Sequence, residues 1–411
     1  MKNIWIFNHY ATGMFKNRGG RHYWFAKNLI ERGYVVTIFC ASTRHNTSES
    51  IDMGQNKYII DSVDEIKFVF VKASNYFGNG KQRVKNMIDF YRNLFPVSRK
   101  YVEKNGKPDI ILASSVHPLT WLAGYKLSKR YNSKFIAETR DLWPETLVAM
   151  GKISRKSIPA KILYKLEKYI YKKADKLIFT FPGGKDYVRS IGVDTSKIKY
   201  INNGVDLEVY NQNKIKEIYY DDDLNDVKTF KVLYTGSMGM ANSLDCLLKA
   251  AKIINDNEIS NIRFVLFGDG YKKNELEKYA EVNNIQNLTF KGKVDKKYIP
   301  YILSRSNLNV ILAEHIDLYK YGLSPNKMFE YMASGKPILS NIECGYDMLK
   351  EYDCGITVKG GLAEALAEGI LKFYNMPKDE YDIYCENALG AAQNFDFKLL
   401  TDKLEKVILE D

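Results

Sequence analysis

The sequence predicts an α/β protein made of two consecutive doubly wound units, each with a parallel sheet covered by helices. Short, continuously apolar runs alternate with helical stretches along the whole 411-residue chain. Such runs are typical of parallel strands that are buried on both faces. The alternation breaks once, at residues 203–228, and then restarts. Two units of about 200 residues are an ordinary size for this class.

The first unit, residues 1–205, begins with an apolar strand at Ile4–Phe7, followed by a glycine loop and a helix that ends near Arg32. Further apolar runs predict strands at 35–40, 67–71, 110–113, 135–137, 177–180 and 199–201, and helices at about 82–104 and 118–130. Residues 203–228 carry a turn signal and the acidic run Asp221–Asp223. We interpret this segment as the connection between the units.

The second unit, residues 206–395, repeats the rhythm. Strands are expected at 232–234, 264–267, 288–290, 308–312 and 338–339, and helices at 242–255, 272–283 and 325–333. The last stretch, Lys398–Leu409, reads as an amphipathic helix. Ligands of doubly wound folds bind at the carboxyl ends of the strands, so two facing units imply a cleft between them.

Charge is distributed unevenly between the two halves. The net charge is +12, but residues 1–205 carry 36 Lys and Arg against 16 Asp and Glu, a net +20, while the remainder carries −8. This asymmetry predicts an anionic partner for the first half, such as a phosphorylated substrate, anionic lipid or nucleic acid. With 45% apolar and 27% charged residues, the chain is neither fibrous nor disordered.

Five scattered cysteines without a C-x-x-C pair exclude a disulfide framework and argue against a structural zinc site. No apolar run reaches the roughly 20 residues of a membrane span, and no signal peptide is recognised, so a cytoplasmic location is expected. No D-x-D motif stands near the segments expected at the cleft. We therefore expect neither an essential metal nor a cofactor.

The sharpest local signal is the segment Ser324–Pro337. Ser324 suits a helix N-cap and Pro325 the first helical position. Lys327 then stands in the first turn, where a cation opposes the helix dipole by roughly 0.3–1 kcal/mol. An anion bound at the helix N-terminus would explain it, with Glu330 one turn further along the same face. An ordinary capped helix with a Lys327–Glu330 pair explains it equally well.

Two glycine-containing turns in the second half follow predicted strands. Thr235–Asn242 includes Gly236, Ser237 and Gly239, and a second turn includes Gly268. Glycines there allow a phosphate to approach the backbone closely, although neither turn is a P-loop and either can be a plain strand–helix turn.

In the first half, four features follow predicted strands. Gly19 and Gly20 come after the first strand, His117 after the strand at 110–113, and Arg140 and Asp141 after the strand at 135–137. Each has an ordinary structural explanation: a turn for the glycines, a buried histidine, a salt bridge from Arg140 to Glu138, and an N-cap for Asp141.

Two basic segments interleave cations with apolar residues. Residues 81–107 hold eight Lys and Arg and residues 152–176 hold nine, beside aromatic residues that include Tyr91, Phe95, Tyr164 and Tyr169. Basic amphipathic helices of this kind can lie on anionic bilayers, whereas a single such segment is more often a solvated face. Two such segments in one half of the chain favour binding to a membrane surface.

Taken together, the chain resembles retaining glycosyltransferases of family 4, which have the GT-B fold, over nearly its whole length. The matching pieces occur in the family's order: Gly19-Gly20, Gly192-Val193 with Ile201–Asp206, Tyr234-Thr235-Gly236, Phe267–Gly270, Phe290–Val294 and Phe329–Pro337. Glu138–Glu145 and Ser324–Lys327 look like the branch associated with N-acetyl-fucosamine transfer in bacterial surface polysaccharide assembly, such as O-antigen or capsule.

The resemblance implies a nucleotide-sugar donor, with UDP as the expected nucleotide. Glu330 would hold the ribose, and Lys327 and Ser324 would contact the diphosphate. The full expected donor set is Gly236, Ser237, Gly239, Gly268, Val294, Ser324, Asn326, Lys327 and Glu330. Gly19, Gly20, His117, Arg140 and Asp141 would approach the transferred sugar or the acceptor, and the final helix, about 396–411, would pack back on the first domain.

The implied reaction is transfer with retention of a hexosyl-type sugar, an N-acetylated amino or deoxy-amino sugar, to a polyprenyl-pyrophosphate-linked saccharide. His117, Lys327 and Glu330 are the expected catalytic residues, on a protein held peripherally at the inner face of the membrane. Two departures stand out. The family's E-x7-E motif has Gly322 where its first acid belongs, and residues 237–244 lack the usual Arg and Lys.

Two other functions remain open on the sequence alone. A sugar-nucleotide 2-epimerase shares the GT-B fold but needs acids and histidines in its cleft, and only five histidines exist. A basic nucleic-acid-binding protein would use the first half, although no recognition motif supports it and the second half is acidic.

Overall fold

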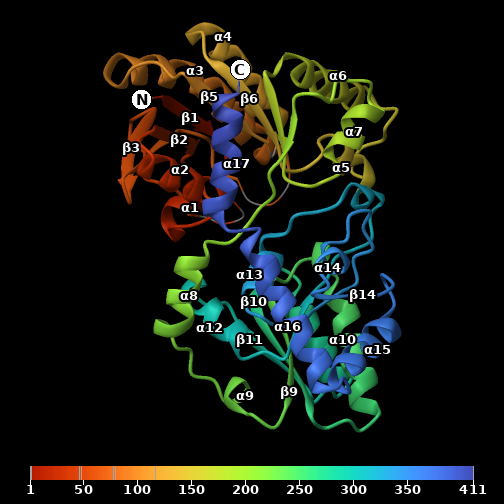
Figure 1. The fold of residues 1–411 in the computed structure, drawn as a ribbon. Coiled ribbons are helices and arrows are strands. Elements are labelled where there is room, and N and C mark those ends of the chain that lie inside the picture. The colour runs from red at the N-terminus through yellow and green to blue at the C-terminus, as the bar shows by residue number, and fades with distance from the viewer. Residues whose placement is uncertain are drawn as a thin grey trace. The chain divides into compact units, whose positions relative to one another are not determined.

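The chain folds into two separate α/β units. The computed structural model describes residues 2–410 apart from residues 46, 48, 77, 79 and 116. One unit comprises the chain up to Asn202 together with Phe397 onward, and the other comprises Asn203–Asp396 (Figure 1). Each unit is built on one sheet and is described by itself.

An eight-stranded sheet forms the first unit, in the order β3-β4-β2-β1-β5-β6-β7-β8. Its strands are β1 Asn3–Phe7, β2 Val35–Ala41, β3 Tyr58–Val63, β4 Ile66–Val71, β5 Ile110–Ser114, β6 Lys134–Thr139, β7 Lys176–Phe179 and β8 Ile198–Tyr200. All neighbours pair in parallel except β3 and β4. The antiparallel edge strand β3 was not predicted, because most of its residues are exposed or half-buried and give no apolar run.

Helices cover this sheet. They are α1 Thr12–Asn17, α2 Arg21–Glu31, α3 Lys81–Asn105, α4 Pro118–Tyr131, α5 Glu145–Ala149, α6 Ile158–Lys173, α7 Gly184–Ser190 and α17 Phe397–Leu409. The predicted C-terminal helix is α17, which packs on α2 (Figure 1). Its buried Leu400, Leu404 and Val407 join Phe25 and Leu29 of α2 in one core cluster. The remote C-terminal segment therefore completes the first unit.

The second unit has a six-stranded, all-parallel sheet in the order β11-β10-β9-β12-β13-β14. The strands are β9 Phe230–Ser237, β10 Ile262–Asp269, β11 Leu288–Gly292, β12 Leu308–Ile311, β13 Ile338–Ser340 and β14 Gly355–Thr357. Its α-helices are α8 Leu207–Lys216, α9 Asp222–Asn225, α10 Leu244–Asp256, α11 Lys273–Val282, α12 Ile299–Ser304, α13 Asn326–Ala333, α14 Met348–Glu351, α15 Ala363–Tyr374 and α16 Lys378–Gln393.

The interpretation of residues 203–228 as a connection is wrong. This segment contains α8, which Asp206 caps by accepting a hydrogen bond from the Val209 amide. Leu207, Tyr210 and Leu224 are buried in the core of the second unit. Because α8 is mostly polar, its sequence shows too little periodicity to predict a helix.

Candidate functional site

The first unit presents its polar residues where the strand order reverses. β1 lies between β2 and β5, so connections leave the sheet in opposite directions on either side of it. Ligands of open α/β sheets bind at such a switch point, beyond the carboxyl ends of the strands. His9 follows β1 and His117 follows β5, so the topology brings both to this point.

These two histidines contact each other directly. His9 Nδ1 lies 2.7 Å from His117 Nε2, and both side chains are buried. Burial lowers the pKa of His9 to about 3 and that of His117 well below its usual range, with Arg83 adding to both effects. Both rings are therefore neutral at ordinary pH. His117 Nδ1 is buried without a hydrogen-bond partner in the described part of the chain.

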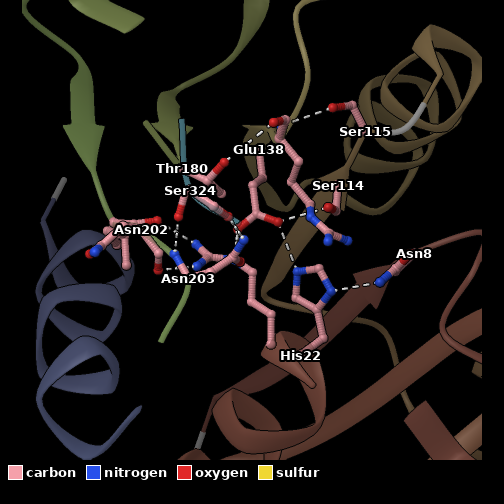
Figure 2. Close-up of polar contacts among 12 residues, drawn as sticks. Asn8, His22, Ser114, Ser115, Glu138, Thr180, Asn202, Asn203 and Ser324 are labelled. Carbon is pink, nitrogen blue, oxygen red and sulfur yellow. Dashed lines mark hydrogen bonds and ion pairs between the residues drawn. The ribbon is translucent and has the colours of Figure 1, made fainter. Parts of the chain in front are cut away.

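A buried charge network fixes the neighbouring strand ends (Figure 2). Glu138, at the end of β6, accepts hydrogen bonds from Arg21 Nε at 2.7 Å and Ser114 Oγ at 2.7 Å, and it pairs with His22 Nε2 at 2.9 Å. Burial alone would raise the pKa of Glu138, but Arg21 and His22 hold it below its ordinary value. Arg21 also donates to the carbonyls of Ile201 and Asn202. The network thus ties the ends of β5 and β6 to α2 and to the residues that follow β8.

Arg140 does not make the salt bridge to Glu138 that the sequence suggested, because Arg21 and His22 occupy that carboxylate. The Arg140 backbone is held instead, by Ser115 Oγ and Thr180 Oγ1. Its Nε is buried without a partner among the described residues. Asp141, an exposed residue, follows in the same loop and is not the N-cap of α5, which is Pro144.

Gly19 and Gly20 lie between α1 and α2, and the short helix α1 occupies part of the loop expected after β1. Gly20 begins α2 with φ +107°, and a Cβ there would lie 3.1 Å from Met14 Cγ. Backbone geometry therefore explains Gly20 without a ligand.

In the second unit, Gly236 and Gly268 lie side by side at the carboxyl ends of β9 and β10. Gly236 and Gly268 pair in register, with φ of +148° and +150°. A Cβ on Gly268 would stand 1.8 Å from the Gly236 carbonyl oxygen. A Cβ on Gly236 would lie 2.8 Å from Lys327 Nζ. Gly268 is thus required for packing, whereas Gly236 keeps the space beside the ammonium open.

Helix α13 begins one residue later than predicted. Pro325 is its N-cap, and Asn326 its first residue, so Ser324 does not cap it. The Ser324 Oγ instead accepts the Asn203 amide at 2.9 Å, and its carbonyl accepts Asn203 Nδ2 at 2.7 Å (Figure 2). No side chain of the residues that the structure describes caps the N-terminus of α13. Its amide groups therefore remain available to an anion.

Lys327 lies in the first turn of α13, against the end of β9. Its Nζ is 3.1 Å from Tyr234 Oη and 3.3 Å from Asn242 Oδ1, and it stands 4.3 Å from the centre of the Tyr234 ring. Burial lowers the pKa of Lys327 to about 8, while Glu330 opposes the shift. The Lys327–Glu330 ion pair does not form. No carboxylate of the described chain lies within salt-bridge distance, so the hydrogen-bond partners of this cation, Tyr234 and Asn242, are both neutral.

Glu330 instead pairs with Lys296 at 3.0 Å, just after β11. The hydroxyl of Tyr210, from α8, is buried without a hydrogen-bond partner in the described ranges, and Glu330 contributes to raising its pKa. A polar group therefore surrounds Glu330, which lies one turn beyond Lys327 on α13. Its other members are Lys296 and Tyr210.

The remaining expected donor residues lie at or after the carboxyl ends of β9 and β11. Ser237 is exposed at the end of β9, and its Oγ accepts Asn242 Nδ2 at 3.0 Å. Gly239 begins the 3-10 turn that follows, and Val294 packs beside the core after β11. Gly322 has φ +83°, a conformation that favours glycine over the expected acid.

Several residues that organise both groups were not predicted from the sequence as site residues. His9, Asn86, Arg21 and His22 support the first, and Asn203 and Tyr210 the second. Their partners are up to 181 positions distant in the chain. No local spacing signals such contacts. The one available sign was that His9 follows β1 directly.

Among the described residues, no three His, Cys, Asp or Glu side chains gather as metal ligands. None of the helices within the described ranges is both long and apolar enough to cross a membrane.

Known families cover both units. Residues 23–209 match the family described as Glycosyltransferase Family 4, and residues 216–388 match the family described as Glycosyl transferases group 1. A curated relative, "Probable glycosyltransferase WbjE" from Pseudomonas aeruginosa, is 21% identical over 359 residues, covering 86% of this chain and 84% of that protein.

Solved structures share the fold over the full length. Sucrose-phosphate synthase from Thermosynechococcus elongatus superposes with a TM-score of 0.74 at 17% identity, covering 99% of this chain and 98% of that one. The Anabaena protein Alr3699/HepE, solved in complex with UDP, gives 0.70 at 14% identity and 99% coverage of both chains. The chain therefore has the GT-B fold and carries glycosyltransferase domains in both units.

Proposed function

We propose that this GT-B glycosyltransferase binds a nucleotide sugar, with UDP as the nucleotide, at the N-terminus of α13 and transfers the sugar with retention to a lipid-linked saccharide. The observation that carries the proposal is Lys327, a buried ammonium whose pKa is lowered to about 8 and which has no carboxylate partner within the described chain. A bound diphosphate would supply the missing negative charge. The complex of Alr3699/HepE with UDP supports the choice of nucleotide.

In this proposal each donor residue has a distinct role. Lys327 and the free amides of α13 hold the diphosphate and stabilise the charge that grows on it as the sugar leaves. Because Gly236 has no Cβ, phosphate oxygens can approach the backbone at Gly236, Ser237 and Gly239. Glu330 binds the ribose hydroxyls, which requires Lys296 to give up part of its present contact.

The sugar and its acceptor are proposed from the resemblance of the sequence. Glu138–Glu145 resemble the branch that transfers N-acetylated deoxy-amino sugars in surface polysaccharide assembly. Arg140 and Asp141 lie in this segment, and the Arg140 amide donates to Ser115, two residues before His117. In a retaining transfer the attacking hydroxyl approaches the face that the diphosphate leaves, and a phosphate oxygen takes its proton. His117, neutral and buried, is placed to contact the sugar rather than to donate a proton.

A membrane-facing role is proposed for the outer surfaces of α3 and α6. Both helices pack against α4, so they lie on the same side of the first-unit sheet. On α6, Ile158, Ile162 and Tyr169 are 74%, 59% and 43% exposed. They recur at helical spacing among the exposed Lys161, Lys165, Lys172 and Lys173.

The same combination occurs on α3. Val84 and Ile88 are 54% and 40% exposed, beside the exposed Lys81, Lys85 and Arg92. Exposed aliphatic residues set among cations suit the surface of an anionic bilayer, where each cation contributes about 1 kcal/mol. Such a surface would bring a lipid-linked acceptor to the first unit and would hold the protein peripherally at the inner face of the membrane.

A thermal-shift screen tests the donor site. UDP, GDP, ADP and CDP are compared first, and the sugar nucleotides of the best base follow. UDP should raise the melting temperature most, and Lys327→Met should abolish the shift while Lys336→Met retains it. A response to none of the four diphosphates would remove the proposed donor.

Liposome co-sedimentation tests the membrane surface. Binding should require anionic lipid, fall as salt rises, and weaken when Lys161, Lys165 and Lys172 are changed to Glu. Lys168 is left intact because its Nζ donates to the Ile191 carbonyl at 2.7 Å. The matched control changes three exposed lysines outside both helices, Lys2, Lys57 and Lys67, to Glu. Equal loss in the two triple variants would contradict a specific surface.

A further inference from the structure

Three buried side chains form a hydrogen-bonded row in the first unit. Asn86 comes from α3, His9 follows β1, and His117 precedes α4. Asn86 Oδ1 lies 2.6 Å from His9 Nε2, and His9 Nδ1 lies 2.7 Å from His117 Nε2. The last atom of the row, His117 Nδ1, has no partner within the described residues.

The orientation of the Asn86 amide fixes the direction of the whole row. Its Nδ2 donates to the Ser74 carbonyl at 2.6 Å and to Thr43 Oγ1 at 3.0 Å. A carbonyl oxygen only accepts hydrogen bonds, so the amide nitrogen must face Ser74 and the amide oxygen must face His9. His9 Nε2 therefore carries a hydrogen.

The position of the hydrogen on His9 in turn determines the position of the hydrogen on His117. A neutral imidazole has one N–H, and burial keeps His9 neutral by lowering its pKa to about 3. His9 Nδ1 is thus an acceptor, and His117 Nε2 must donate to it. His117 is also neutral, so its Nδ1 bears a lone pair and no hydrogen. A buried acceptor without a partner is unfavourable, and a hydrogen-bond donor on a ligand would remove that penalty.

We propose that Asn86 and His9 are positioning residues that lock His117 in the tautomer with hydrogen on Nε2, so that His117 Nδ1 accepts a hydrogen bond from a saccharide hydroxyl. The locked tautomer selects the ligand group. A hydroxyl can donate a hydrogen bond to Nδ1. A phosphate or carboxylate oxygen has only lone pairs to present, which would repel the lone pair of Nδ1. The row ends at the switch point between β1 and β5, where a ligand of this sheet is expected.

The tautomer is independent of the proposed function, and only the identification of the hydroxyl as part of a saccharide rests on it. Nitrogen NMR of protein labelled with 15N-histidine measures the tautomer directly, because protonated and bare ring nitrogens have well-separated shifts. Signals are assigned with a His117→Asn variant. His117 should show hydrogen on Nε2 and a bare Nδ1. Hydrogen on Nδ1 in the wild type would overturn the proposal.

Two substitutions at His9 separate positioning from packing. His9→Gln can still accept from His117 and donate to Asn86, whereas His9→Phe keeps the ring that packs on Phe90 and Tyr10 but makes neither hydrogen bond. His9→Phe should release the tautomer and lower kcat/KM for sugar transfer about tenfold. His9→Gln should preserve both.

An unchanged tautomer and rate in His9→Phe would refute the positioning role. If the tautomer is locked but the protein has no transferase activity, the proposed function is wrong, whereas the inference about the tautomer remains supported.

Discussion

Lys327 should make nucleotide binding depend on pH in a way that its removal abolishes. The pKa of Lys327 in the unliganded protein is lowered to about 8, because the ammonium is buried against Tyr234 and Asn242. A diphosphate beside it favours the charged form and raises that pKa again. Binding at alkaline pH must therefore take up a proton, and the affinity for UDP must fall as the pH rises through 8.

The size of the effect follows from the lowered pKa. At pH 7 nearly all Lys327 is charged, whereas at pH 9 only about one molecule in eleven is. If the bound form stays fully protonated, the affinity falls about tenfold between these pH values, which corresponds to about 1.4 kcal/mol.

Isothermal titration calorimetry with UDP at pH 7 and pH 9, in buffers of different ionisation enthalpy, measures both the affinity and the proton uptake. Lys327→Met should bind weakly and show only the pH response and proton uptake that come from ionisation of UDP itself, whereas Lys336→Met should behave as the wild type. An equal pH response in the wild type and Lys327→Met would refute the reasoning.

Three further substitutions test other parts of the account. Glu330→Gln should weaken UDP binding at least about tenfold without lowering the melting temperature, because hydrogen bonds to a charged group contribute about 1.5–3 kcal/mol. An unchanged affinity in calorimetry would show that Glu330 does not belong to the site. Glu138→Gln should destabilise the protein by about 3–5 kcal/mol, because it leaves the Arg21 charge buried alone. The pKa of Glu138 is lowered on folding, so ionised Glu138 stabilises the folded protein above the ordinary carboxyl pKa, and this stabilisation is lost as the pH falls. The free energy of unfolding of the variant should therefore depend less steeply on pH in the acid range. Gly268→Ala should cost at least about 1–3 kcal/mol in urea unfolding, because its Cβ would meet the Gly236 carbonyl; wild-type stability would show that the turns do not pack as described.

Sequence patterns predicted what is local or periodic. Most of the buried parallel strands, several of the helices between them and α17 follow from apolar runs and from amphipathic spacing, whereas β14, α15 and α16 were not predicted. The edge strand β3 and the polar helix α8 were missed, because their residues bury too little apolar surface to leave a pattern.

The chemistry of the candidate site was predicted only in part. Lys327 was noticed because a cation in a first helical turn is unfavourable by itself. The pairing of Glu330 with Lys296 and of Ser324 with Asn203, and the row from Asn86 to His117, depend on contacts between distant segments. Such contacts exist only once the sheets have formed, so no spacing in the sequence indicates them.

The most direct test of the central claim is a transfer assay with a UDP-linked N-acetyl sugar and a polyprenyl-pyrophosphate-linked saccharide presented in anionic vesicles, with the product anomer read by NMR. The account predicts a lipid product extended by one sugar in the donor's anomeric configuration, formed far more slowly by Lys327→Met. Turnover of the sugar nucleotide without an acceptor, or a product of inverted configuration, would contradict it.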